Sequence, residues 1–328
     1  MVYVALFGCT MLTEQAGPRE LVPHAVGAER AGSDFTVFSD HTFPRPESQG
    51  HVPYAWSVLD AAAQATSTLP LMTFVTCPTF PYHPAVIAQK AATTHMLSRG
   101  RFRLGLGSGE NVNENLNEHI VGAGWPTAPV RLEMLEEAFG IIRSLLAGDT
   151  VSHGGVHFDV DNAKLWDLPE DPPRIGIAVS GELSCGIAGR YGDLVIATEP
   201  RRELLEAFDT HRGAGKPRIG RLPVCYDPDR DAAIARAHDR FRQSVGGWKV
   251  KAELPGPAGF EQAGTHIRPE DVADVIPSGA DVHAFVEAVR PFRDAGFTEI
   301  ALVQVGGDQQ EPFLCWAQAE LLPALREL

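Results

Sequence analysis

The stretches LPLMTFVT (69–76), PAVIAQKAATTHMLSRG (84–100) and RFRLGLG (101–107) follow one another closely and decide the fold. The first and the third are continuous apolar runs of strand length. The middle stretch begins with proline and ends with glycine, which are typical start and stop signals of a helix. Apolar strands that alternate with helices are typical of a parallel sheet buried on both faces. These residues therefore predict a strand–helix–strand unit.

The same alternation continues in both directions along the chain. Strands are expected at 2–8, 34–40, 69–76, 101–107, 174–180, 193–199, 217–226 and 297–307. Helices are expected at 18–32, 56–67, 84–100, 130–148, 182–191, 201–211, 227–241, 281–296 and 310–328. This number of units in 328 residues favours an α/β fold with a single (β/α)8 TIM barrel over an open doubly wound sheet. We expect one domain, 1–328, with insertions at about 108–128 and 245–278.

The amino-acid composition disfavours some classes of function. Lys and Arg number 28 against 42 Asp and Glu, a net charge of −14, which argues against a general nucleic-acid or membrane-surface binder. The N-terminal residues MVYVALFGCT lack a basic leader, so we interpret 3–8 as a buried strand and not a signal peptide. Five widely spaced cysteines without a CxxC motif indicate reduced thiols and a cytoplasmic protein.

Polar and ionisable residues gather where the expected strands end, which is where barrel enzymes place their chemistry. Asp40-His41 ends the second strand, and histidine can take a proton from a substrate hydroxyl near neutral pH. An Asp-His pair that only satisfies loop backbone groups is the alternative. Glu110 follows GLGSG (105–109), and a carboxyl at a barrel mouth can donate a proton if its pKa is raised.

The glycine run beside Glu110 is a weak match to a dinucleotide-binding motif, because no long helix follows it and its third glycine is misplaced. We interpret Gly109 as a place where backbone approaches a ligand, with a plain wide turn as the alternative. Ser180-Gly181 precedes the expected helix 182–191, so this segment is either a phosphate site or an ordinary helix cap. Scattered histidines give no metal motif, and His153 and His157 fall in an expected hairpin.

Five segments together resemble the luciferase-like flavin and deazaflavin oxidoreductases, and within them the branch of coenzyme F420-dependent glucose-6-phosphate dehydrogenases. They are PTFPYHPAVIAQKAAT (78–93), GRFRLGLGSGENVNE (100–114), GWPTAPVRLEMLEEA (124–138), AKLWDLPEDPPRIGIAVSG (163–181) and ALVQVGGDQQ (301–310). The resemblance covers nearly the whole chain. It implies a (β/α)8 barrel, usually a homodimer, that binds the deazaflavin at the carboxyl ends of its strands.

The resemblance also implies roles for individual residues. His41 corresponds to the base that removes the hydroxyl proton as hydride leaves carbon, and Glu110 to the acid that protonates the reduced ring or stabilises its charge. Phe74-Val75 falls where the family has a non-proline cis peptide beside the ring. The remaining implied cofactor contacts are Asp40, Cys77, Gly109, Asn113, Ser180 and Gly181, and Thr198 matches a threonine on the substrate side.

The sequence departs from the family pattern after Asp40-His41, where Arg45 replaces a tryptophan. This arginine could bind an anionic substrate or lie in a solvated loop. Arg201 lies near one of the family's phosphate-binding residues, and 255–280 shows no clear second or third. Glucose 6-phosphate is therefore not the substrate that these residues favour.

The hypothesis drawn from these residues is an F420-dependent oxidoreductase that transfers a hydride between an alcohol or sugar-type carbon and C5 of the deazaflavin. An F420-dependent epimerase or reductase in a natural-product pathway and an FMN-dependent luciferase-like monooxygenase are the alternatives, so FMN is the alternative cofactor. A non-catalytic barrel is disfavoured, because it needs none of Asp40, His41, Glu110 and Asn113.

Overall fold

The computed structural model describes residues 5–79, 82–111 and 124–328. Eight parallel strands form a closed ring in the order β1, β2, β3, β4, β7, β8, β9, β11 and back to β1. They are β1 (Leu6–Met11), β2 (Thr36–Phe38), β3 (Leu71–Thr73), β4 (Phe102–Leu106), β7 (Ile175–Ala178), β8 (Leu194–Ala197), β9 (Arg218–Tyr226) and β11 (Glu299–Gln304). The predicted TIM barrel is confirmed.

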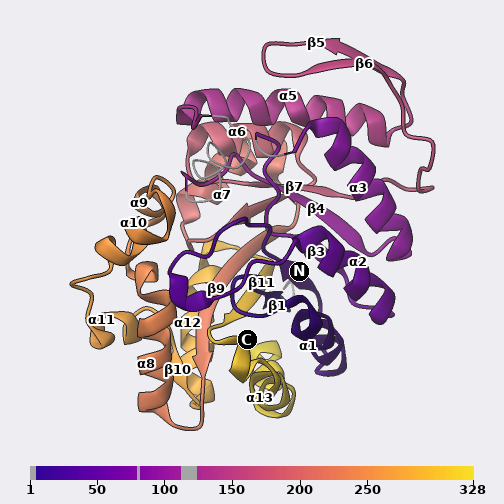
Figure 1. Cartoon of the computed structure of the whole chain (residues 1–328). Coiled ribbons are helices and arrows are strands. Elements are labelled where there is room, and N and C mark those ends of the chain that lie inside the picture. Colours follow the sequence, from indigo (N-terminus) through magenta and orange to yellow (C-terminus); the bar gives the residue numbers. More distant parts are fainter. Residues whose placement is uncertain (1–4, 80–81, 112–123) are drawn as a thin grey trace.

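Helices surround this ring (Figure 1). The main ones are α1 (Pro18–Arg30), α2 (Ala55–Ala65), α3 (Pro84–Leu97), α5 (Ala128–Leu146), α6 (Glu182–Tyr191), α7 (Arg202–Phe208), α8 (Arg230–Phe241), α12 (Val282–Ala295), α13 (Gln310–Trp316) and α14 (Leu322–Arg326). Proline occupies the first turn of α1, α3 and α5, where its missing N–H costs no hydrogen bond.

The first strand is β1, Leu6–Met11, which ends three residues later than the predicted end at residue 8; the predicted start at residue 2 or 3 lies outside the described residues. The apolar run continues through buried Leu12, and the chain then turns at Thr13–Gln15, all three of them buried. The expected strand 2–8 and the expected helix 18–32 left this polar stretch between two elements. Its actual place is the carboxyl end of a barrel strand, and this correction places Glu14 at the barrel mouth.

Side chains inside the ring and between ring and helices form separate packed layers. Phe35, Val37, Met72, Phe74, Leu194, Ile196, Ile219 and Ala301 form a cluster contributed by the strands themselves. Gly8 leaves room for this cluster, since a Cβ there would lie 2.6 Å from the Phe35 ring. Arg103 of β4 and Glu299 of β11 form an ion pair of 2.8 Å near the starts of their strands. The described side chains thus fill the barrel interior, and a cavity opens at the strand ends that carry the polar loops.

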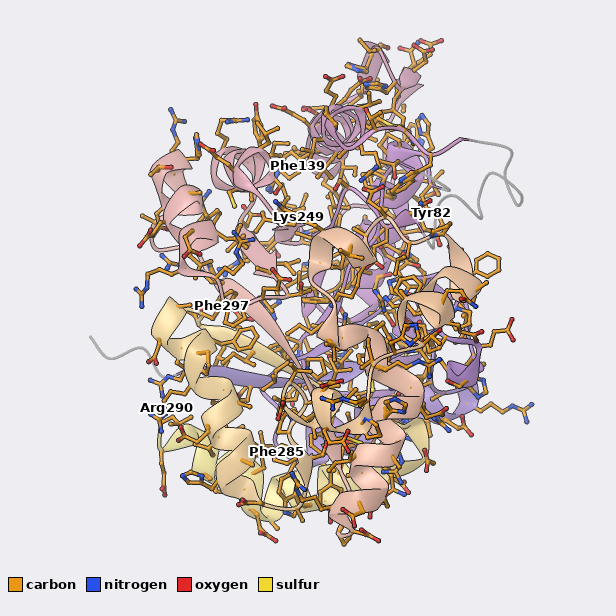
Figure 2. All side chains as sticks on the ribbon, turned by 90° about the vertical axis from the view of Figure 1, so that its left-hand side faces the viewer. Tyr82, Phe139, Lys249, Phe285, Arg290 and Phe297 are labelled. Carbon is orange, nitrogen blue, oxygen red and sulfur yellow. The ribbon has the colours of Figure 1, made fainter. Side chains whose placement is uncertain are left out.

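Two additions project from the barrel. The antiparallel hairpin of β5 (Val151–Gly154) and β6 (Asp159–Ala163) extends beyond α5 in Figure 1, and Glu137 of α5 accepts hydrogen bonds from the backbone of His157 and Phe158. The predicted insertion 245–278 contains α9 (Trp248–Lys251), α10 (Gly256–Ala263), α11 (Pro269–Ala273) and the short β10 (Ser278–Gly279). Figure 2 turns this side toward the viewer and labels Lys249 of α9.

Other expectations from composition concern the thiols and the membrane. All five cysteines are described and none forms a disulfide, and burial raises the pKa of the Cys9, Cys185 and Cys225 thiols to about 11. Within the described ranges, the helices are too short or too polar to cross a bilayer.

Candidate active site

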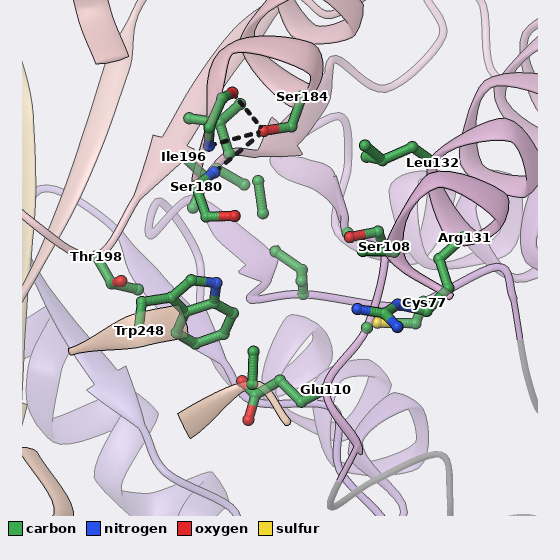
Figure 3. A pocket seen from close by; sticks show the side chains of 18 of the residues that line it. Cys77, Ser108, Glu110, Arg131, Leu132, Ser180, Ser184, Ile196, Thr198 and Trp248 are labelled. Carbon is green, nitrogen blue, oxygen red and sulfur yellow. Dashed lines mark hydrogen bonds between the residues drawn. The ribbon is translucent and has the colours of Figure 1, made fainter. Parts of the chain in front are cut away.

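A cavity of about 480 Å³ opens at the carboxyl ends of the barrel strands (Figure 3). Such a volume suits a small organic ligand. The residues predicted from sequence that line it are Asp40, His41, Arg45, Phe74, Val75, Cys77, Gly109, Glu110, Ser180, Gly181 and Thr198. These residues follow the ends of five different strands, so the fold brings together most of the predicted site.

His41 is held by a carboxylate that sequence reasoning missed. Its Nδ1 contacts Oε1 of Glu14, and the Glu14 side chain is completely buried. Oε2 of Glu14 accepts hydrogen bonds from Ser39 Oγ at 2.5 Å and from Thr13 Oγ1 at 3.2 Å. A carboxylate that accepts from Nδ1 favours the imidazole tautomer with an unprotonated Nε2. His41, which lines the cavity, therefore has the arrangement of a general base.

Arg45 joins two acidic residues. Its Nη2 donates to both carboxylate oxygens of Glu110, at 2.8 and 2.9 Å, and its Nη1 lies 3.4 Å from Oε1 of Glu14. Only 5% of Arg45 is exposed. The solvated-loop interpretation of Arg45 is therefore wrong, because its guanidinium is desolvated and satisfied by two carboxylates.

The ion pair between Arg45 and Glu110 changes the pKa of Glu110 in the direction opposite to the one expected from the sequence. Burial alone raises the pKa of the Glu110 carboxyl, but the positive charge of Arg45, the electrostatic interaction with His41 and the hydrogen bond from Arg45 outweigh it and lower the pKa. Burial likewise opposes ionisation of Glu14, and His41 and Arg45 hold the pKa of Glu14 well below its usual range. The raised pKa expected for a proton-donating Glu110 is thus wrong in this state, where Glu110 is a carboxylate bound to an arginine.

Asp40 also lies at the cavity, fixed by donors from neighbouring elements. Oδ2 accepts from Thr76 Oγ1 at 2.6 Å and from the Trp56 indole N–H at 3.0 Å, and Tyr82 OH lies 3.5 Å from Oδ1. Burial raises the pKa of Asp40, and the hydrogen bonds from Thr76 and Trp56 and the charge of Lys90 act against it. These contacts orient one face of the carboxyl and leave the other beside the cavity.

The wall of the cavity next to Asp40 is built from the end of β3. The peptide bond between Phe74 and Val75 is cis, as the resemblance implied. Val75 lies against the backbone of Gly107, where a Cβ would come within 2.6 Å of Val75 Cγ2. Gly109 adopts a φ of +92°, a conformation that side chains other than glycine rarely tolerate. The glycines after β4 therefore serve close packing and a tight turn beside the cavity.

Ser180 and Gly181 form the other end of the cavity, at the start of α6. Figure 3 shows Ser180 and Glu110 at opposite ends of the view, with Trp248 between them. The backbone N–H groups of Ser180 and Gly181 donate to Ser184 Oγ, at 3.1 and 3.2 Å. Ser184 thus acts as a local cap, so these two N–H groups already have acceptors. The Ser180 hydroxyl and the first N–H groups within α6 are the donors that remain for a ligand.

The remaining predicted residues have different outcomes. Arg201 is exposed, lies outside the cavity lining, and forms ion pairs of 3.9 Å with Glu199 and Glu203. Asn113 lies outside the described residues. Thr198 lines the cavity from the end of β8, as expected for a residue on the ligand's side.

Sequence reasoning also missed Arg221 of β9 and Trp248 of α9, which line the cavity. Arg221 stands between Gly220 and Leu222 in the interior of β9, and a charged residue inside a strand is a pattern that could have identified it. The insertion that carries Trp248 is tied to the loop after β4, because Asn111 donates to the backbone carbonyls of Ala252 and Glu253. Arg131 of α5 pairs with Glu253 at 3.0 Å. These contacts hold residues 248–253 against the cavity.

A filled eight-stranded barrel with an acid–base cluster at one end of an open cavity defines a barrel enzyme site. The chain matches the model of the luciferase-like monooxygenase family over residues 1–310 and belongs to that family. The resemblance found in the sequence is confirmed.

Relatives and solved structures agree with this placement. An F420-dependent glucose-6-phosphate dehydrogenase of Microbacterium testaceum is 34% identical, with 98% of this chain and 97% of that protein covered. An F420-dependent hydroxymycolic acid dehydrogenase of Mycobacterium tuberculosis is 33% identical, over 97% of this chain and 88% of that protein. The structure of an F420-dependent secondary alcohol dehydrogenase with an F420–acetone adduct superposes with a TM-score of 0.87 at 24% identity, over 98% and 99% of the two chains.

Proposed function

We propose that this chain is an F420-dependent oxidoreductase that transfers a hydride between an alcohol or sugar-type carbon and C5 of the deazaflavin, with His41 as the general base. The observation that carries the proposal is that His41 lines the cavity and that its Nδ1 pairs with buried Glu14, so that Nε2 is the nitrogen left for a substrate. Relatives that match nearly the whole chain are named F420-dependent dehydrogenases, which supports the same cofactor.

The cavity fits a long molecule with a flat ring and an anionic tail. Its lining includes the apolar side chains of Val75, Ala178 and Ile196, and one end carries Ser180 and the start of α6 (Figure 3). Helix starts favour phosphate groups through their free N–H groups and dipole. Asp40, Phe74, Val75, Cys77 and Gly109 would then border the ring, and Ser180 and Gly181 the tail. When bound, the deazaflavin supplies a carbon that accepts or returns a hydride and activates oxygen poorly.

The chain's own residues supply the proton chemistry. His41 Nε2 would take the hydroxyl proton of the alcohol, and Glu14 would stabilise the imidazolium that results. Glu14 can do so because the Arg45 charge and the hydroxyls of Thr13 and Ser39 keep its carboxyl ionised although it is buried. In the reverse direction the same nitrogen returns the proton. Glu110 holds Arg45 in place, and a proton-donating role for Glu110 requires that ion pair to open.

A screen of alcohols and sugars with F420, followed at 420 nm, tests the proposal. We expect His41→Ala to reduce kcat by about 10²–10⁴-fold while F420 affinity stays within a few-fold, since the imidazole acts on the substrate. His51→Ala, which removes an exposed histidine, is the matched control and should keep wild-type turnover. Wild-type kcat in His41→Ala would show that His41 is not the base.

A further inference from the structure

Arg221 is a cation in the cavity whose described protein contact is with an aromatic ring, since its guanidinium carbon lies 6.0 Å from the centre of the Phe241 ring. It comes from the middle of β9 and lines the same space as His41 and Glu110. Its Nε is buried and unpaired, and within the described part of the chain its guanidinium makes no ion pair and no hydrogen bond. An arginine has five N–H donors, and leaving them without acceptors in a desolvated place is costly.

The other arginines that line the cavity are matched. Arg45 is bound by Glu110 and Glu14, and Arg131 by Glu253 and the Pro126 carbonyl. Arg221 therefore differs from its neighbours in having an unused guanidinium. No carboxylate of the described cavity lies within ion-pair distance of it.

Arg221 lies within the field of another cation. Burial and then the Arg45 charge lower the pKa of Arg221 to about 10, and the charges of Glu14 and Glu110 oppose this more weakly. Burial followed by Arg45 and Arg221 lowers the pKa of Lys251 to about 8, against the charges of Glu110 and Glu199. A bound anion would relieve the repulsion between Arg45 and Arg221.

We propose that Arg221 binds an anionic group, a carboxylate or a phosphate, that the substrate carries close to the carbon that reacts. This inference rests on the proposed function and names its substrate class. A guanidinium can grip either oxyanion through two parallel hydrogen bonds. Because Arg221 interacts with the charges of Glu14 and Glu110, the anionic group lies near the base and not at a remote end. Hydroxy acids and short hydroxyalkyl phosphates meet this requirement, and neutral alcohols do not.

Calorimetric titration of the F420-loaded protein with oxamate and with inorganic phosphate tests the anion site directly. At least one anion should bind the wild type, and Arg221→Gln should weaken it by about 10- to 100-fold. Arg221→Lys, which keeps the charge, should recover part of the loss. Arg201→Gln, which removes an exposed arginine outside the cavity lining, should bind like the wild type. Preference for oxamate or for phosphate identifies the oxyanion.

Turnover gives the second readout. Two pairs of candidate substrates are compared: lactate with 1,2-propanediol, and glycerol 1-phosphate with glycerol. Within each pair both molecules carry an alcohol, but only the first carries an anionic group. We expect Arg221→Gln to raise KM for the charged member and to leave the neutral member unchanged. Absence of anion binding by the wild type, or equal binding by wild type and Arg221→Gln, overturns the proposal. Anion binding that persists in a protein that does not bind F420 would instead overturn the proposed function and leave the anion site standing.

Discussion

Replacing Arg45 with methionine tests whether this arginine stabilises two buried carboxylates. The side chain is 5% exposed, its bonds to Glu110 are 2.8 and 2.9 Å long, and Glu14 lies 3.4 Å away. Removing one member of a buried pair typically costs about 3–5 kcal/mol. Glu110 borders the cavity and can take up a proton instead. From the ordinary carboxyl pKa of 4.5, that protonation costs about 3 kcal/mol at pH 7 and about 1 kcal/mol at pH 5.5.

The loss of stability in Arg45→Met should depend on pH, and the carboxyl pKa values determine the direction of this dependence. In the wild type the lowered pKa values of Glu14 and Glu110 stabilise the fold above the ordinary carboxyl pKa, and this contribution is lost as the pH falls below it. In Arg45→Met the carboxyl pKa values rise, so stability is lost as the pH increases. The difference in the free energy of unfolding should therefore grow from pH 5.5 to pH 7.

Urea denaturation at pH 5.5 and pH 7 measures this difference. Arg268→Met, which removes an exposed ion pair with Asp271, is the control and should unfold at the wild-type urea concentration at both pH values. An Arg45→Met protein as stable as the wild type at pH 7, or equally destabilised at both pH values, would refute the role given to Arg45.

Two further predictions concern Glu14 and the thiols. Glu14→Gln removes the acceptor of His41 Nδ1 and should lower kcat by about 10²–10⁴-fold in the F420 assay; a fall of less than threefold would show that Glu14 does not position the base. With a disulfide reagent at pH 8, exposed Cys315 should react rapidly, whereas Cys9, Cys185 and Cys225, whose thiol pKa values are about 11, should react only in urea. Rapid reaction of those three in the native protein would contradict their burial.

Much of the barrel was predictable because its signals are local. Proline and glycine mark the ends of 84–100, and the structure has a helix at Pro84–Leu97. The first strand was misplaced because its apolar run extends past residue 8 to Leu12. Hydrophobic pattern alone cannot say that the polar residues after it are buried, so Glu14 was missed.

The site was predictable only where the chemistry follows the end of a strand, as with Asp40-His41. The partners of Arg45 were not, because Glu14 and Glu110 lie 31 and 65 residues away in the sequence. Barrel closure brings these residues together, and the resulting charges set the pKa of Glu110 opposite to the direction expected from its position alone. For Arg201, position in the sequence was misleading. It lies near one of the family's phosphate-binding residues in the sequence, but it is outside the cavity lining.

Fluorescence titration of the purified protein with F420 and with FMN tests the central claim most directly. We predict tight binding of F420 and much weaker binding of FMN, with a loss of F420 affinity when Gly107 is replaced by alanine, whose methyl group would collide with Val75 in the cavity wall. Tight binding of FMN without binding of F420 would contradict the account.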